Sequence, residues 1–163
     1  MDYFEDYRDM LQLFNKYDVK YLVIGAYAMG NYGYSRYTLD IDLWIEKSIS
    51  NAQKIQKAFN DFPIPYEITV EELMRENFVL QIGIEPMRID VLTDIDGVEF
   101  LDAWNNKTNN SLFGEEINFI SLQHLIKNKK ATNRKKDKYD VIELENIEQI
   151  EDRKYKNINK GTY

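Results

Sequence analysis

A strict alternation of aliphatic and other side chains marks residues 39–45 of the chain. Because side chains of a β-strand point alternately to the two faces of a sheet, this period of two predicts a strand. The odd positions are aliphatic, and the even positions are Asp40, Asp42 and Trp44. The chain is therefore expected to build a sheet in which one strand carries two carboxylates on the same face, about 7 Å apart between their Cα atoms.

A third carboxylate occurs in a similar setting. A strand is expected over residues 88–93, and it carries Asp90 between aliphatic neighbours. Asp is rare in strands, and like charges on one sheet face repel unless a cation lies between them. Three strand-borne carboxylates that face the same way can hold one or two divalent ions, so Asp40, Asp42 and Asp90 are the predicted catalytic and metal-binding residues. The alternative is that they are ordinary solvent-facing strand residues.

The supply of other metal ligands is small. The chain has no Cys and a single His, His124. Disulfides, thiolate metal sites, Cys nucleophiles and His clusters are thereby excluded. A bound metal would have oxygen ligands, which favours Mg²⁺ or Mn²⁺, with Ca²⁺ as a further alternative.

The segment before the first acids offers candidate phosphate ligands. Residues 21–24 predict a buried strand, and residues 26–32 predict a short helix after it. A Gly-Ala turn at the start of a helix can present backbone N–H groups to a phosphate, and an Arg can bind one through two parallel hydrogen bonds. An ordinary turn is the alternative. The predicted ligands in this segment are Gly25, Ala26, Arg36 and Thr38.

A basic run stands out in an acidic chain. Residues 127–138 hold seven Lys or Arg, although the net charge of the whole chain is −7. The run is either a solvated helix face or a source of triphosphate ligands. Lys127 and Lys130 lie three residues apart on one helix face, so they are the predicted ligands. Asp137 and Asp140 share a face of the next helix and are expected to pair with these bases.

The whole pattern predicts an α+β fold, in which helices flank a mixed sheet and the C-terminal portion, from about residue 121, is helical. One domain is expected over residues 1–152, followed by a polar tail over residues 153–163. Further strands are expected over 78–82 and 117–120. Further helices are expected over residues 2–17, 50–60, 98–104, 121–131 and 136–150, and a short one after the capping box of Thr69 and Glu72. Ser50 is the expected N-cap of the helix over 50–60, and Ser121 that of the helix over 121–131.

Composition limits the location and the partners. Hydrophobic residues make up 44% of the chain, which is enough for a core. No apolar run approaches the ~20 residues of a membrane span, and the acidic start lacks the apolar stretch of a signal peptide. A cytoplasmic protein without membrane contact is therefore expected. The negative net charge opposes non-specific attraction to nucleic acid, so a polyanion would need a local basic patch.

The ordered combination of these motifs resembles the DNA polymerase β-type nucleotidyltransferase superfamily. Its pattern is a strand with a Gly-Gly or Gly-Ser turn, a strand with two acids and a later strand with a third acid, matched here by residues 22–26, 39–43 and 89–91. The sequence is more similar still to small standalone bacterial nucleotidyltransferase-like proteins, the minimal or toxin-like members, through residues 36–42, 125–130 and 134–140. Ala26 departs from the superfamily pattern, which usually has Gly or Ser there.

The resemblance implies an activity. It is the Mg²⁺-dependent transfer of a nucleoside monophosphate from a nucleoside triphosphate such as ATP to an acceptor hydroxyl, with release of pyrophosphate. RNA or protein is favoured as the acceptor because the basic run is so local. One alternative is an antibiotic-modifying nucleotidyltransferase. Another is a non-catalytic nucleotide-binding protein, or a toxin–antitoxin component that binds a partner encoded by an adjacent gene.

Overall fold

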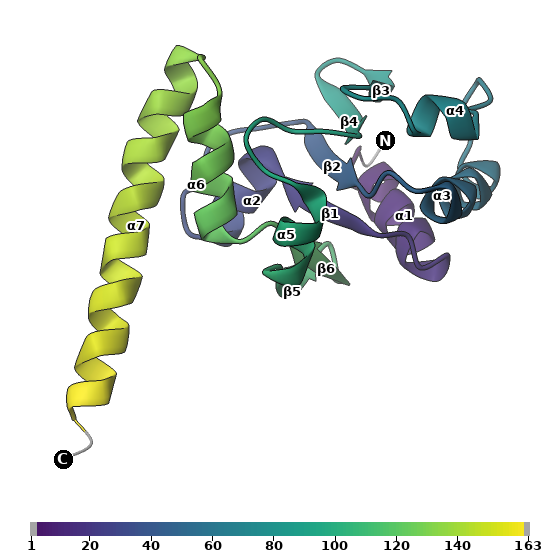
Figure 1. Ribbon diagram of the computed structural model, residues 1–163. Coiled ribbons are helices and arrows are strands. Elements are labelled where there is room, and N and C mark those ends of the chain that lie inside the picture. The colour runs from purple at the N-terminus through teal and green to yellow at the C-terminus, as the bar shows by residue number, and fades with distance from the viewer. Residues whose placement is uncertain (1–2, 162–163) are drawn as a thin grey trace.

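A computed structural model describes residues 3–161 of the chain (Figure 1). Residue 2 of the first predicted helix and residues 162–163 of the predicted tail lie outside the described residues. In chain order the elements are α1 (Tyr3–Lys16), β1 (Tyr21–Ile24), α2 (Gly25–Asn31), β2 (Ile41–Ile45), α3 (Ile49–Asp61), α4 (Val70–Leu73), β3 (Val79–Ile84), β4 (Met87–Leu92), α5 (Phe100–Asn105), β5 (Thr108–Leu112), β6 (Glu115–Phe119), α6 (Leu122–Ala131) and α7 (Lys135–Lys160).

The strands form one mixed sheet in the order β3-β4-β2-β1-β6-β5. The central strands β1 and β2 are antiparallel, whereas β2 with β4 and β1 with β6 are parallel. Hairpins of β3 with β4 and of β5 with β6 complete the two edges. The predicted α+β class with a mixed sheet and a helical C-terminal portion is confirmed.

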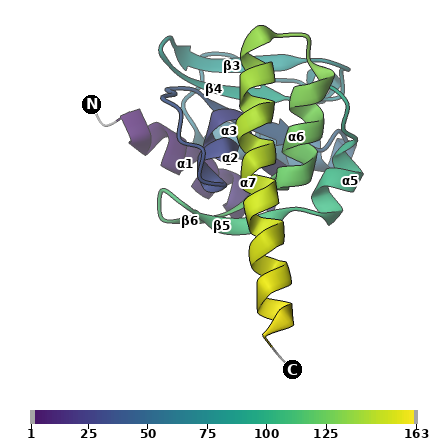
Figure 2. The ribbon, with the colours of Figure 1, turned by 90° about the vertical axis from the view of Figure 1, so that its left-hand side faces the viewer.

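Helices cover both faces of the sheet. Figure 1 places α1 and α3 on one side and α2, α6 and α7 on the other, and the turned view in Figure 2 has α6 and α7 in front of the sheet. Because both faces are covered, β1 is buried along its whole length, with Leu22 and Val23 fully inaccessible. Among residues 3–161, no helix is both long and apolar enough to cross a membrane.

The face of β2 that carries the acids is only partly open. Trp44 was expected to share a face with the carboxylates, and it is 1% exposed. Its ring packs edge-on against Phe100 of α5 with centroids 5.0 Å apart, and its Nε1 donates to the carbonyl of Thr93 at 3.3 Å. This covers the face at the Trp44 end and leaves the opening at the acid end.

Three local predictions need correction. The cap of α3 is Ser48, because its hydroxyl accepts from the backbone N–H of Asn51 at 3.1 Å, and Ser50 lies inside the helix. β5 was missed because it is a polar edge strand that pairs only with β6 and shows no apolar alternation. The last helix was predicted to end near residue 150, but it continues to Lys160.

The end of α7 projects from the body of the molecule, as Figure 2 shows. Residues 151–161 are all exposed. Most of them were predicted to form a polar tail, but α7, which is anchored to the body at its start, continues through them to Lys160. The anchor is the start of α7, where Asp137, Asp140 and Leu144 are buried. The capping box of Thr69 with Glu72 and the cap of α6 by Ser121 are both confirmed.

Candidate active site

Two of the predicted acids face each other across neighbouring strands. β2 and β4 run parallel in a register that pairs Asp42 with Asp90. Paired residues of adjacent strands point to the same face and lie about 5 Å apart. The flanking side chains of Ile41 and Leu43 are buried in the core, which fixes the strand that carries Asp42.

The third acid lies on the loop that leads into β2. Asp40 precedes the first residue of the strand, although the alternation predicted that the strand would begin at residue 39. Thr38 Oγ1 donates to the carbonyl of Asp40 at 3.3 Å, and the hydroxyl of Tyr7 donates to the carbonyl of Leu39. These hydrogen bonds hold the loop beside the sheet, with the side chain of Asp40 41% exposed.

Crowding of the acids affects the proton affinity of Asp42. Burial, followed by the charges of Asp90 and Asp40, raises the pKa of Asp42 from 3.8 to about 6. The positive charges of Lys129 and Arg88 act in the opposite direction. The ionised form of Asp42 is therefore disfavoured by burial and by its acidic neighbours, and a bound cation would stabilise it.

Gly25 has a structural reason to be Gly. Its φ is +66°, a backbone conformation that L side chains rarely adopt, and a Cβ there would lie 2.3 Å from Asp42 Oδ2. The turn predicted to approach a phosphate therefore also makes room for the carboxylate of Asp42.

Arg88 is a site residue that the sequence analysis missed. Its Nε donates to Asp90 Oδ1 at 2.6 Å, and its Nη2 donates to Asp90 Oδ2 at 2.9 Å. The same Nη2 lies 3.7 Å from Asp40 Oδ2. The available signal was its spacing, because residues 88 and 90 of one strand share a face.

A buried ion network forms the opposite wall. Lys129 Nζ lies 3.1 Å from Asp137 Oδ1 and 3.4 Å from Asp140 Oδ2. Arg36 Nη1 donates to both oxygens of Asp140, at 3.0 and 3.1 Å, and Arg134 Nε donates to Asp137 at 2.8 Å. The expected pairing of Asp137 and Asp140 with the basic run is confirmed.

The network fixes the charge of its most buried acid. Burial alone would raise the pKa of Asp137, but hydrogen bonds from Thr132 and Lys129 hold it below its ordinary value. Asp137 therefore stays ionised, and it can keep Lys129 and Arg134 in place as charged groups.

The acids and the basic wall line one cavity of about 400 Å³. Seven predicted site residues line it: Gly25, Ala26, Arg36, Thr38, Asp40, Asp42 and Asp90. The basic side chains on the wall are Lys129 of α6, Arg134 at the N-cap of α7 and Lys136 of α7. The cavity therefore combines a floor of carboxylates with a cationic wall.

The structure places Lys127 and Lys130 outside this cavity. Lys127 is exposed, and Lys130 forms an ion pair with Glu145 at 2.5 Å. The register of α6 explains the difference, because Leu122, Leu125, Ile126 and Lys129 are its buried positions. Those positions follow the i, i+3, i+4, i+7 pattern of one helix face, so the sequence did contain a signal for Lys129.

Metal ligation by the acids remains a prediction. Among residues 3–161, no three Asp, Glu or His side chains, as they are placed, converge as a bound ion requires. Both oxygens of Asp90 instead face a cation of the chain itself, the guanidinium of Arg88. Asp90 thus already binds a positive charge, and the candidate ligand atoms are all carboxylate oxygens. These residues therefore fit a hard divalent ion such as Mg²⁺ or Mn²⁺.

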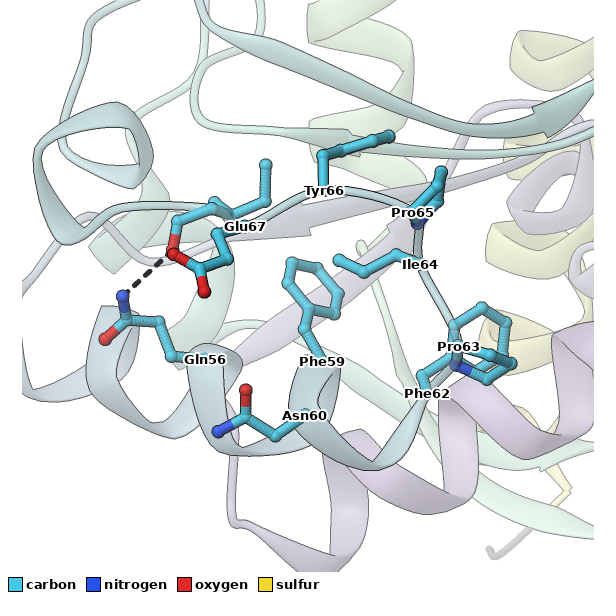
Figure 3. A pocket seen from close by; sticks show the side chains of 10 residues that line it. Gln56, Phe59, Asn60, Phe62, Pro63, Ile64, Pro65, Tyr66 and Glu67 are labelled. Carbon is cyan, nitrogen blue, oxygen red and sulfur yellow. Dashed lines mark hydrogen bonds between the residues drawn. The ribbon is translucent and has the colours of Figure 1, made fainter.

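A larger cavity, of about 670 Å³, lies between α3 and the loop that follows it. Figure 3 shows Phe59 and Ile64 across from each other in this cavity, with Gln56 bonded to the carbonyl of Ile68 at 2.9 Å. Its lining within the described residues includes one carboxylate, Glu67, and no Lys or Arg. It shares no lining residue with the acid-lined cavity, which is the one suited to phosphate chemistry.

Comparison with known proteins bears on the fold. No protein-family model matches the chain, and no curated protein sequence matches it either. Among solved structures, the chain is similar to a protein from Thermotoga maritima described as "a putative nucleotidyltransferase", with 18% identity and a TM-score of 0.54. The similarity covers 96% of this chain and 93% of the other. At this identity the likeness shows the fold alone, so the chain has a nucleotidyltransferase-like fold.

Proposed function

We propose that this protein is a nucleotidyltransferase that depends on Mg²⁺ or Mn²⁺. The observation that carries the proposal is the pairing of Asp42 with Asp90, beside Asp40, on the floor of a cavity with a cationic wall. A nucleoside triphosphate needs this combination, because its polyanionic chain requires positive charge and its reacting phosphate requires a divalent ion. The similarity to the Thermotoga maritima structure supports the proposal at the level of the fold.

The chain's own residues have distinct roles in this proposal. Arg36 and Lys129, held by Asp140, bind the outer phosphates, as do Arg134 and Lys136 at the cavity rim. Gly25 and Ala26 line the cavity at the turn after β1 and let the triphosphate approach the backbone closely. Asp40 and Asp42 would hold the divalent ion, which, when bound, neutralises charge on the reacting phosphate.

Asp90 is the proposed base of the reaction and an additional metal ligand. The acceptor oxygen forms a bond to the α-phosphorus, and the bond from that phosphorus to the β-phosphate oxygen breaks, with the electron pair leaving on pyrophosphate. The proton of the acceptor hydroxyl passes to the carboxylate of Asp90. Its position opposite Asp42 supports this role, because a phosphate whose metal ion is held by Asp42 would lie near the carboxylate of Asp90.

Calorimetry of Mg²⁺ with each nucleoside triphosphate tests the site. The variant Asp40→Asn with Asp42→Asn should lose most of the binding and keep its fold. Asp94→Asn is the matched control, because Asp94 lines the same cavity but pairs with Lys47 at 2.7 Å. Unchanged affinity in the double variant would contradict the site assignment.

The proposed acceptor is a macromolecule, RNA or protein, with RNA the easier of the two to test. Of the seven basic residues in the run, Lys129 alone is buried, and two of the six exposed ones, Arg134 and Lys136, line the cavity. For RNA, transfer should fall steeply as salt rises, because phosphate contacts release counterions.

Replacing Lys127, Lys135 and Lys138 together by Gln should weaken transfer to RNA and leave nucleotide binding intact, since these three exposed residues lie outside the cavity. Labelling confined to aminoglycosides, which are cationic, would instead support the antibiotic-modifying alternative.

A further inference from the structure

The guanidinium of Arg88 occupies the space between two of the acids. Two of its nitrogens bind the two oxygens of Asp90 in parallel, at 2.6 and 2.9 Å, and one of these also lies 3.7 Å from Asp40. The side chain of Arg88 is 16% exposed, so little water screens these contacts. A forked Arg–carboxylate pair of this kind is among the stronger ionic contacts in proteins.

A second partner holds the outer end of the same side chain. Arg88 Nη1 donates to Glu85 Oε1 at 2.6 Å, and the side chain of Glu85 is 78% exposed. Glu85 lies in the turn between β3 and β4, three residues before Arg88. The guanidinium is therefore held between an exposed carboxylate at the turn and the buried carboxylate of Asp90.

Occupation of Asp90 has a consequence for a metal ion. Because both oxygens of Asp90 accept hydrogen bonds from Arg88, an ion that binds this carboxylate must share it with the guanidinium and is repelled by its positive charge. Asp42, opposite Asp90, keeps its carboxylate free of Arg88 contacts among the described hydrogen bonds and ion pairs. An ion can therefore meet Asp42 without contact to Arg88, and its charge would then favour movement of the guanidinium away from Asp90.

We propose that Arg88 is an internal counter-cation of this site, which binds Asp90 and Asp40 in the absence of a divalent ion and moves towards Glu85 when the ion binds. This inference rests on the proposed metal-dependent function. Arg88 is thus a positioning residue: it limits the mutual repulsion of the acids before loading and lowers the affinity of the empty site for metal. Glu85 supplies a partner for the guanidinium after the exchange.

Mn²⁺ binding without nucleotide, followed by electron paramagnetic resonance, tests the exchange. Arg88→Gln should bind Mn²⁺ more tightly than the wild type by on the order of tenfold, because the competing contact is removed. Arg88→Lys keeps the charge and loses the fork, so its affinity should fall between the two. Glu85→Gln should bind Mn²⁺ more weakly, because the displaced guanidinium has lost its second partner.

Lys47→Gln is the control for loss of a positive charge near the cavity. Lys47 pairs with Asp94, which lines the cavity, and it makes no contact with the three acids among the described ion pairs. Its Mn²⁺ affinity should stay within about twofold of the wild type, as expected for a screened charge. Equal strengthening in Lys47→Gln and Arg88→Gln would show a general charge effect and overturn the inference.

Two further outcomes separate this inference from the proposed function. If the wild type binds Mn²⁺ through Asp40 and Asp42 and Arg88→Gln binds it equally well, the inference fails and the proposed function stands. If no variant with intact acids binds Mn²⁺, both fail. A thermal melt of each Arg88 variant shows whether it is folded, and Arg88→Lys remains informative should Arg88→Gln unfold.

The guanidinium can also be observed directly. The Nε–H resonance of Arg88, assigned by its absence in Arg88→Lys, should report a hydrogen bond to Asp90 in the metal-free protein. Titration with Mg²⁺ should shift this resonance and speed its exchange with solvent. A resonance that stays unchanged while Mg²⁺ saturates the site would contradict the displacement.

Discussion

Gly25 links the backbone of the site to its chemistry. In Gly25→Ala the added Cβ would lie 2.3 Å from Asp42 Oδ2, in a backbone conformation with φ +66°. We expect a loss of about 1–2 kcal/mol in unfolding free energy from the strained backbone, together with a large loss of affinity for Mg²⁺ and nucleotide because Asp42 is displaced.

Gly33→Ala is the matched control for this variant. Gly33 has φ +98°, and no atom lies within 4 Å of the Cβ that Ala would add there. Denaturant unfolding should show a similar loss of stability in both variants, whereas calorimetry should show weaker nucleotide binding only in Gly25→Ala. Equal binding by the two variants would separate Gly25 from the site.

The raised pKa of Asp42 makes stability depend on pH in a specific direction. Its carboxyl ionises near 3.8 when unfolded and at about 6 when folded. Between these values the folded state binds more protons, so the free energy of unfolding falls as pH rises through this window. Above pH 6 the buried charge persists and its destabilising effect is complete.

Asp42→Asn should therefore stabilise the metal-free protein at neutral pH. We expect a gain of about 1–3 kcal/mol over the wild type near pH 7.5 and a much smaller gain near pH 4.5. Urea unfolding in the presence of a chelator measures both. A gain of the same size at the two pH values would show that the effect does not come from ionisation of Asp42.

At the scale of elements, α6 and α7 are joined by the buried ion network. Lys129→Ala would leave Asp137 and Asp140 buried with fewer cationic partners. Breaking a buried pair by removing one partner is costly, and we expect a loss of about 3 kcal/mol in unfolding free energy. Lys127→Ala, at an exposed position of the same helix, should change it by less than ~0.5 kcal/mol. Similar losses in both variants would contradict the role assigned to the network.

Elements with a strong apolar pattern were predictable from the sequence. The buried run of β1 and the alternation in β2 predicted strands that the structure contains, because each must bury aliphatic side chains against covering helices. β5 was not predictable in this way, since an edge strand of polar residues owes its conformation to its partner β6. The last third of α7 is likewise mostly polar and exposed, so no apolar pattern predicts it, although Gly161 marks its end.

Side-chain identity within the site was less predictable than the elements. Arg88 and Lys129 are basic residues in or next to segments that were correctly assigned, yet their roles depend on the partners they meet. Arg88 faces Asp90 because residues 88 and 90 of one strand share a face of the sheet. It reaches Asp40 because β4 lies next to β2, and this strand order is a property of the tertiary fold. Lys129 was overlooked because burial of a Lys is rare without paired acids, and these come from the next helix.

At the scale of the whole molecule, the cavity depends on the meeting of the sheet with the helical C-terminal portion. The sheet supplies Asp42 and Asp90 from β2 and β4, and the loop before β2 supplies Asp40. α6 and the segment after it supply Lys129 and Arg134, which complete the cationic wall. This division explains why a chain with net charge −7 can still present a site for a polyanion.

The most direct test is release of pyrophosphate from labelled nucleoside triphosphates in the presence of Mg²⁺ or Mn²⁺ and total RNA or cell protein. Turnover is expected from the wild type and from the control Asp94→Asn. Asp90→Asn should lower turnover by about 10²-fold or more with a much smaller change in nucleotide affinity, because the role of Asp90 falls mainly in the transition state. Nucleotide binding without turnover by the wild type, or undiminished turnover in Asp90→Asn, would contradict the proposed function.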